Sequence, residues 1–253
     1  MVLVLLACAL RPGGGPATAE ARALAEAETR WAARARPGEI EAAVDLWRGV
    51  IGADPDQPLA LARLARAEWA LGQRDPAAAR PRFEAAQEYG WRCLAAWPGY
   101  GAALAGEAYR VTEAGAAALP AAAAPCLLWT AVAGLSLAAE RGPGAALELE
   151  DVAVLLGRLD ALAGEPLPEP LDPGFLPWAR ACLEEARAAP DPAPASARAA
   201  FAAAVAADPA VGIFRRDYAR AFPDARDLAF AGFPPAGAQP WAAENAAWGR
   251  GAP

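Results

Sequence analysis

The sequence contains no histidine and no lysine, so every basic side chain is an arginine. Without histidine the chain lacks the commonest general base, the usual partner of a catalytic serine or cysteine, and the commonest metal ligand. The net charge is −7 and no basic cluster offsets it, whereas nucleic-acid binding requires a cationic surface. We therefore expect no catalytic residues, no metal or other cofactor, and no nucleic-acid partner.

Isoleucine, threonine and valine, the residues that favour β-sheets, are also scarce. Alanine, the strongest intrinsic helix former, is abundant, and apolar residues recur at intervals of three and four. A chain of 253 residues can bury one sizeable core without metals or disulfides. The pattern predicts an all-α protein with helices over residues 20–36, 39–53, 58–71, 75–97, 100–114, 125–139, 148–162, 175–188, 194–207, 211–222 and 241–248, the third of them ending at Gly72.

The spacing of small residues, aromatics and prolines is typical of tetratricopeptide hairpins. In that pattern a small residue is followed by an aromatic four positions later, a small residue three later, and proline five later. Its three occurrences are Ala43, Trp47, Val50 and Pro55; Ala86, Gly90, Cys93 and Pro98; and Ala197, Phe201, Ala204 and Pro209. The second lacks the aromatic, and its proline follows the first by more than the usual repeat of about 34 residues. The sequence predicts stacked helical hairpins with an overlong second hairpin.

The four cysteines show no zinc-binding spacing. Cys93, Cys126 and Cys182 lie in apolar surroundings, and we expect them to be buried free thiols. Cys8 ends the tetrapeptide LLAC inside an apolar run too short to span a bilayer, which resembles a bacterial lipobox at the end of a signal segment. This predicts a lipidated Cys8, a signal-like segment at residues 1–8, a flexible tether at 9–19, and a helical-repeat domain at 20–253. No basic residue precedes the run, and a cytoplasmic or a plainly secreted protein remains the alternative.

Residues 114–139 carry no charge, so a membrane-spanning helix has to be considered. Pro120 and Pro125 interrupt the stretch, which favours a buried core helix instead. Within it, Trp129 lies among small residues. Two readings stay open: Trp129 borders an apolar channel with Thr130 and Ser136 as polar groups, or it packs tightly in the centre.

Several other side chains are candidates for ligand or partner binding. Trp47 and Trp69 are expected in the core because they keep the repeat spacing. Arginine binds carboxylates with two parallel hydrogen bonds, so the pair Arg215 and Arg216 is a candidate anion site, although a solvated pair has the same sequence. Acidic residues at 148–151 suit a helix N-terminus better than an acid/base pair. The binding candidates are Trp91, Trp97, Trp129, Tyr109, Arg215, Arg216 and Asn245, the last of which has a helix-end hydrogen bond as its alternative role.

Three stretches together resemble the T-component lipoproteins of TRAP transporters. The first is AAVDLW at residues 42–47 with the Asp-Pro at 54–55 and LARAEW at 64–69; the second is LWTAVAGL at 128–135; the third is DYA at 217–219 with ENA at 244–246. The resemblance covers most of the chain after residue 25, while the proline-rich segments after residues 165 and 230 depart from it.

This resemblance implies a non-enzymatic, periplasm-facing lipoprotein anchored to a bacterial membrane by lipid alone. It implies a homo-oligomer that binds the solute-binding protein of a TRAP system and holds small hydrophobic or organic-acid solutes in a channel. The alternative is a generic tetratricopeptide-type scaffold for protein–protein interaction.

Overall fold

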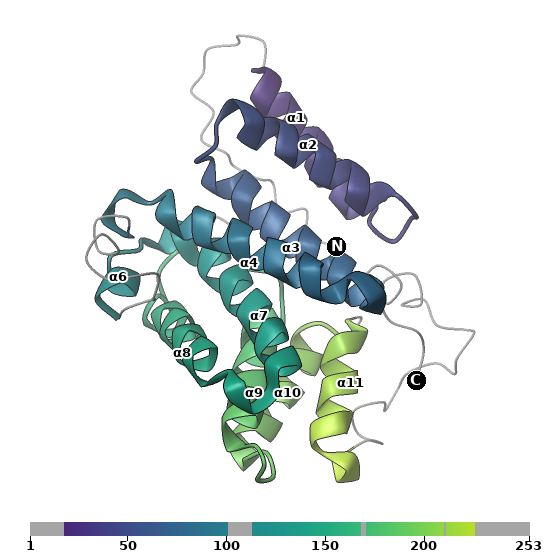
Figure 1. The fold of residues 1–253 in the computed structure, drawn as a ribbon, viewed down its shortest axis with the longest axis vertical. Helices are drawn as coiled ribbons and strands as arrows, with labels where there is room; N and C mark the ends of the chain where they lie inside the picture. The colour runs from purple at the N-terminus through teal and green to yellow at the C-terminus, as the bar shows by residue number, and fades with distance from the viewer. Residues whose placement is uncertain (1–17, 101–112, 168–170, 210, 226–253) are drawn as a thin grey trace.

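The computed structural model describes residues 18–100, 113–167, 171–209 and 211–225, and within these ranges it contains helices and turns but no strand (Figure 1). The prediction of an all-α fold is confirmed. Cys8, Tyr109, Asn245 and the helix expected at 241–248 lie outside the described residues. The longer helices are α1 (Ala19–Ala32), α2 (Glu39–Ala53), α3 (Pro58–Arg74), α4 (Ala79–Ala95), α7 (Ala124–Arg141), α8 (Ala146–Ala161), α9 (Phe175–Ala188), α10 (Ala195–Ala207) and α11 (Gly212–Ala221), with a short α6 (Glu113–Ala117).

Successive helices pack against one another as hairpins. The first four helices follow one another in contact, α7 packs on α3 and α4, and α8 and α9 pack on α7. Figure 1 shows α1 and α2 at one end of the molecule and α9, α10 and α11 at the other, with α7 between them. Helix α7 therefore joins the N-terminal hairpins to the C-terminal helices.

Most of the repeat positions identified in the sequence face the core. Trp47 and Phe201, the aromatic residues of the first and third occurrences, are fully buried, as are the alanines four residues before them. In the second occurrence Gly90 takes the aromatic position and lies against α7: a Cβ at Gly90 would lie 2.5 Å from Oγ1 of Thr130. Glycine at this position lets α4 and α7 approach closely.

The helix bounds agree with the sequence expectations at α2 and α9 but not at Gly72. The prediction that Gly72 ends the third helix is wrong, because α3 continues to Arg74. Gly72 is instead a contact point, where a Cβ would lie 2.6 Å from the ring of Phe83 on α4. The predicted cap is present: the side chain of Asp75 accepts a hydrogen bond from the amide of Ala77 at 3.0 Å.

Helix α7 is the central core helix. Residues Ala121–Arg141 are long and apolar enough to cross a membrane, but 83% of the 18-residue window with the highest hydropathy is buried inside the protein. Trp129 is 1% exposed, and its ring lies 5.7 Å from Trp69 and 5.0 Å from Phe175, measured between centroids. The prediction of a buried core helix is confirmed, and Trp129 packs at its centre.

Cys93 and Cys126 form a disulfide between α4 and α7, with their Cα atoms 5.6 Å apart. The expectation of three free thiols is therefore wrong for this pair, while Cys182 is free. The close approach of α4 and α7 at Gly90 brings the two cysteines within the usual Cα separation of a disulfide.

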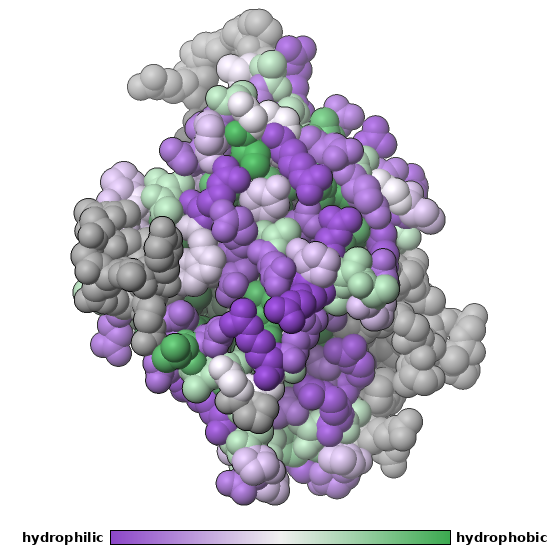
Figure 2. All heavy atoms as spheres, viewed as in Figure 1, coloured by the Kyte–Doolittle hydropathy of each residue, from purple (hydrophilic) through white to green (hydrophobic). Residues whose placement is uncertain are grey.

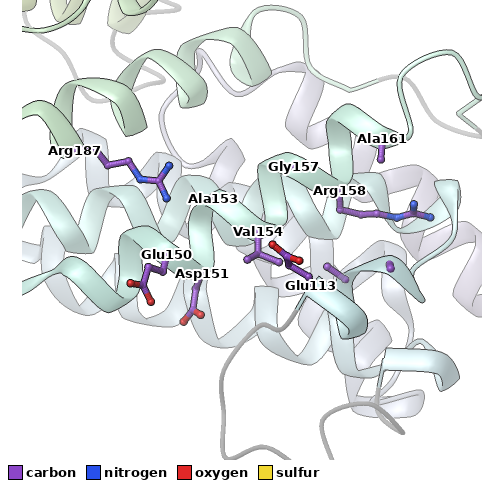
Figure 3. A pocket seen from close by; sticks show the side chains of 11 residues that line it. Glu113, Glu150, Asp151, Ala153, Val154, Gly157, Arg158, Ala161 and Arg187 are labelled. Atoms are coloured by element: carbon purple, nitrogen blue, oxygen red, sulfur yellow. The ribbon is translucent and has the colours of Figure 1, made fainter.

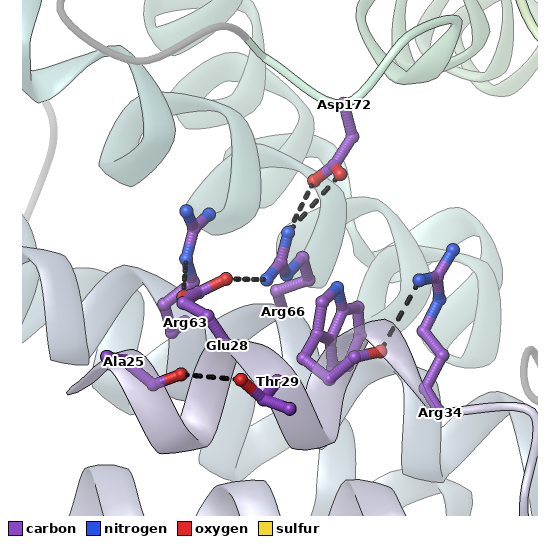
Figure 4. Close-up of polar contacts among 8 residues, drawn as sticks. Ala25, Glu28, Thr29, Arg34, Arg63, Arg66 and Asp172 are labelled. Atoms are coloured by element: carbon purple, nitrogen blue, oxygen red, sulfur yellow. Dashed lines mark hydrogen bonds and ion pairs between the residues drawn. The ribbon is translucent and has the colours of Figure 1, made fainter. Parts of the chain in front are cut away.

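Two charged side chains of α3 are buried and held by opposite charges. Glu68 is fully buried, and its carboxylate oxygens accept hydrogen bonds at 2.7 Å from Arg48 of α2 and Arg82 of α4. Arg66 is 4% exposed, and its Nη1 donates at 3.2 Å to both carboxylate oxygens of Asp172, in the segment before α9 (Figure 4). These contacts tie α3 to its neighbours because an unpaired buried charge is costly.

Arg66 also contacts α1. Its guanidinium lies 4.1 Å from the ring centroid of Trp31, and its Nη2 is 3.9 Å from Glu28 (Figure 4). Burial lowers the pKa of Arg66 to about 10, against the opposing effect of Asp172. One side chain thus joins the first hairpin to the segment that leads into α9.

Candidate binding cleft

A cleft of about 1260 Å³ opens between the C-terminal helices and the central hairpins. Its walls come from α3, α4, α7, α8, α9 and α11, and we call it the α7–α11 cleft. It exceeds the range of about 300–1,000 Å³ that is usual for small-molecule sites, so part of it can remain filled with water around a small ligand.

The apolar wall of the α7–α11 cleft is part of the aromatic core. Trp178 of α9 lines the cleft, and its ring centroid lies 5.8 Å from that of Trp69 and 5.9 Å from that of Phe175. Gly174, with φ of 80°, precedes this helix, and a Cβ there would lie 2.5 Å from the ring of Phe214. The aromatic cluster fixes α9 against α3 and α11 and so sets the shape of this wall. The other apolar residues that line the cleft include Phe83, Leu135, Ala138, Ala146, Leu149 and Ile213.

The polar wall is a chain of ion pairs centred on Asp217 of α11. The Asp217 carboxylate is 5% exposed and accepts hydrogen bonds from the indole of Trp178 at 3.1 Å and from Nε of Arg216 at 2.9 Å. Arg220, one turn further along α11, donates to Glu185 of α9 at 2.9 Å, and its Nε is 4.0 Å from Asp217. Arg216 and Arg220 are 54% and 61% exposed, so both keep guanidinium surface open to a ligand.

Two titratable groups of α9 line this wall. Burial raises the pKa of Glu185, the nearby charge of Asp217 raises it further, and Arg220 opposes both. Burial also raises the pKa of the Cys182 thiol well above its ordinary value, with Asp217 and Glu185 acting in the same direction. The wall therefore holds Cys182 as a neutral thiol and makes the ionised form of Glu185 less favourable than in water.

A second cavity of about 700 Å³ lies between α6 and α8 (Figure 3). Glu150 and Arg187 line both this cavity and the α7–α11 cleft, and Figure 3 shows Arg187 reaching from α9 toward α8. Arg158 is fixed on its rim, because its Nε and Nη2 donate to the carbonyl of Leu119 at 3.1 and 2.6 Å. Glu148, in the first turn of α8, forms an ion pair with Arg141.

The structure separates the two arginines that the sequence placed together. Arg216 lines the cleft, whereas Arg215 does not: its side chain is 6% exposed and donates from Nε to the carbonyl of Pro209 at 3.1 Å. Burial lowers the pKa of Arg215 to about 10. The predicted pair therefore does not form one site, because adjacent helical residues point about 100° apart.

The tryptophan candidates lie outside the cleft. Trp91 and Trp97 are partly buried against the core, and neither lines the α7–α11 cleft or the α6–α8 cavity. Trp129 lines neither cavity either, and the described residues around it leave no channel beside its ring. Of its two predicted polar neighbours, Ser136 lines the cleft and accepts from Trp69 at 2.8 Å, while Thr130 donates to the carbonyl of Cys126.

Sequence reasoning missed most of the polar wall. Asp217 was named only as the first residue of the DYA stretch at 217–219, and Trp178, Glu185 and Arg220 were not singled out. Helical spacing carries the signal: Trp178, Cys182 and Glu185 fall on one face of α9, and Ile213, Arg216, Asp217 and Arg220 on one face of α11. Reading these two faces as partners would have located the wall.

The outer surface gives no competing apolar site on the face seen in Figure 2. Hydrophilic residues cover most of it, and hydrophobic ones appear as small separate patches. Leu147 is the large hydrophobic residue that the described part of the chain exposes, at 57%. Single exposed residues of this kind do not make a docking surface.

Comparison with protein-family models gives no match, and comparison with curated protein sequences gives none either.

Proposed function

We propose that the protein is a non-enzymatic helical-repeat lipoprotein that holds a small solute in the α7–α11 cleft and associates with the solute-binding protein of a TRAP-type transporter. The cleft carries this proposal. It combines an apolar wall with a short row of charged groups, the arrangement by which binding sites orient a ligand that has an apolar body and one polar end. The resemblance to the T-component lipoproteins supplies the partner and the transport context.

The Cys93–Cys126 disulfide supports the periplasmic part of the proposal. Structural disulfides persist in oxidising compartments such as the bacterial periplasm and are rare in the cytosol. Its position between α4 and α7, where both cysteines are at most 2% exposed, favours a structural bond over an exposed redox pair. Lipid attachment at Cys8 would then hold the helical domain at the membrane surface as the sole anchor.

Association with a solute-binding protein is the decisive test. The full chain should form a complex with the TRAP solute-binding protein encoded beside it, measured by analytical ultracentrifugation, which also reports whether the chain alone is a homo-oligomer. Absence of both a complex and neighbouring TRAP genes would favour the generic interaction scaffold instead.

Lipidation has its own measurement. Labelled palmitate should enter the wild-type chain in bacteria and should not enter a Cys8→Ser variant. Equal labelling of the two proteins, or none in the wild type, would exclude the lipid anchor and would leave the association with a solute-binding protein to the ultracentrifugation experiment.

A further inference from the structure

The α7–α11 cleft has a definite polar end. Arg216 and Arg220 lie four residues apart on the same face of α11, and both line the cleft. Two like charges at this spacing repel each other unless anions lie against them. In the structure Asp217 and Glu185 supply the anions, so the site is already arranged around two carboxylates.

The two carboxylates are not equivalent. Asp217 is 5% exposed and accepts hydrogen bonds from both Trp178 and Arg216, so its departure would leave the indole N–H of Trp178 without its acceptor at the apolar wall. Glu185 is 23% exposed and holds Arg220 through one hydrogen bond. Glu185 is therefore the carboxylate that an incoming anion can replace.

The residues beside these arginines are apolar and indicate the chemical character of the rest of the ligand. Ile213 lies one turn before Arg216 on the same face, and Trp178 packs beside Asp217. Across the cleft, α4 and α7 contribute Phe83 and Leu135. A ligand whose carboxylate contacts the arginines thus has an apolar surface to cover with the remainder of its structure.

We propose that the α7–α11 cleft binds a monocarboxylate with an apolar body, whose carboxylate lies between Arg216 and Arg220 and displaces Glu185 from Arg220. This rests on the proposed function and specifies its solute class. Arg187 is the third arginine that lines the cleft, but it also lines the α6–α8 cavity, and we do not include it in the site.

Displacement of Glu185 couples binding to protons. Without Arg220, Glu185 faces Asp217 from α11 and Cys182 from its own helix, while Glu140 of α7 and Glu150 of α8 line the same cleft. Arg216 is the remaining cation of the cluster, and it is held by Asp217. Loss of the ion pair favours the protonated form of Glu185, so carboxylate binding takes up a proton and strengthens as the pH falls.

The test uses octanoate and 1-octanol as probes, with isothermal titration calorimetry on the full chain. Wild type should bind octanoate at least about tenfold more tightly than 1-octanol, since hydrogen bonds to charged groups are involved. Arg216→Gln and Arg220→Gln should each remove this preference. Arg187→Gln inside the cleft and Arg80→Gln, at an exposed position of α4 outside the cleft, should retain it. Octanoate titrations in two buffers of different ionisation enthalpy should show net proton uptake.

Glu185→Gln distinguishes displacement of Glu185 from a general disturbance of the fold. This variant should keep or strengthen octanoate binding and should abolish proton uptake. Equal binding of octanoate and 1-octanol, retention of the preference in Arg220→Gln, or no binding of either probe would overturn the inference. None of these results decides the association with a solute-binding protein, which the ultracentrifugation experiment measures independently.

Discussion

Gly90 of α4 and Thr130 of α7 lie so close that a Cβ at Gly90 would be 2.5 Å from the threonine Oγ1 and 3.0 Å from its Cα. The threonine cannot simply rotate away, because its backbone is part of the contact and its hydroxyl donates to the carbonyl of Cys126 at 2.7 Å. This contact sets the distance between the N-terminal hairpins and the central helix, and it lies within one helical turn of Cys93, which is disulfide-bonded to Cys126.

Gly90→Ala should therefore destabilise the fold. Overpacking of a close helix contact costs about 1–3 kcal/mol, which outweighs the gain in helix propensity from alanine. The measurement is the free energy of unfolding in urea. Gly49→Ala on α2 is the matched control, because nothing lies within 4 Å of a Cβ there, and it should stabilise by about 0.5–1 kcal/mol. Stabilisation by both substitutions would contradict the contact.

The hairpins were predictable from local sequence because helix periodicity, proline and repeat spacing all act over a few residues. Helix α2 begins and ends where its pattern indicates, between Gly38 and Asp54. Gly72 was misread because a glycine that stops a helix and a glycine that admits Phe83 look alike in sequence. Only the packing of α4 on α3 separates the two cases.

Trp129→Ala should cost about 3–5 kcal/mol of unfolding free energy, because the indole is enclosed by Trp69 and Phe175 and its removal leaves a cavity. Urea unfolding measures this, and Trp91→Ala, at a partly buried position, should cost clearly less. A small loss for Trp129→Ala accompanied by altered octanoate binding would instead restore the channel reading of this helix.

The Cys93–Cys126 bond should contribute about 2–4 kcal/mol, because it closes a loop with a sequence separation of 33 residues in the unfolded chain. Addition of reductant should lower the urea midpoint of wild type and of Cys182→Ser. The double variant Cys93→Ser with Cys126→Ser should be insensitive to reductant. Equal midpoints for wild type in oxidising and reducing buffer would show that the bond is absent.

Parts of the cleft could not be predicted from local sequence patterns, because they depend on contacts between helices that are distant in the sequence. Arg216 was found because arginine pairs suggest anions, but its true neighbour on the helix face is Arg220, and its counter-charge Asp217 is shared with Trp178 of another helix. Pairing between α9 and α11 depends on how the aromatic cluster packs, which the sequence does not state. The disulfide between Cys93 and Cys126 was missed for the same reason, because no local sequence pattern indicates that α4 and α7 are in contact.

The ion pair between Arg66 and Asp172 should stabilise the fold more than a surface ion pair does, although the Asp172 side chain is partly exposed. Asp172→Asn removes the main counter-charge of a guanidinium that is 4% exposed, so we expect a loss of about 1–3 kcal/mol in unfolding free energy. Asp224→Asn is the control: Asp224 is 69% exposed and pairs with Arg198 at the surface, and its loss should leave the urea midpoint unchanged. Equal effects of the two substitutions would show that Arg66 finds sufficient compensation elsewhere.

The raised pKa of Glu185 predicts the direction in which the free energy of unfolding changes with pH. A carboxyl whose pKa is higher in the folded chain than in the unfolded chain binds more protons when folded. Its contribution therefore favours folding below the unfolded-state value of about 4.3 and is lost as the pH rises through the folded-state value. Burial is the leading cause and Asp217 adds to it, while Arg220 reduces the effect without abolishing it.

The measurement compares the unfolding free energies of wild type and Glu185→Gln over the mildly acidic range. The difference should shift in favour of the variant as the pH rises, because glutamine occupies the same site without ionising. Glu184→Gln is the matched control on the same helix, and its difference from wild type should not follow this trend. If Glu185→Gln instead lost stability relative to wild type with rising pH, the ion pair with Arg220 would outweigh burial, and Glu185 would not be the group that a carboxylate ligand displaces.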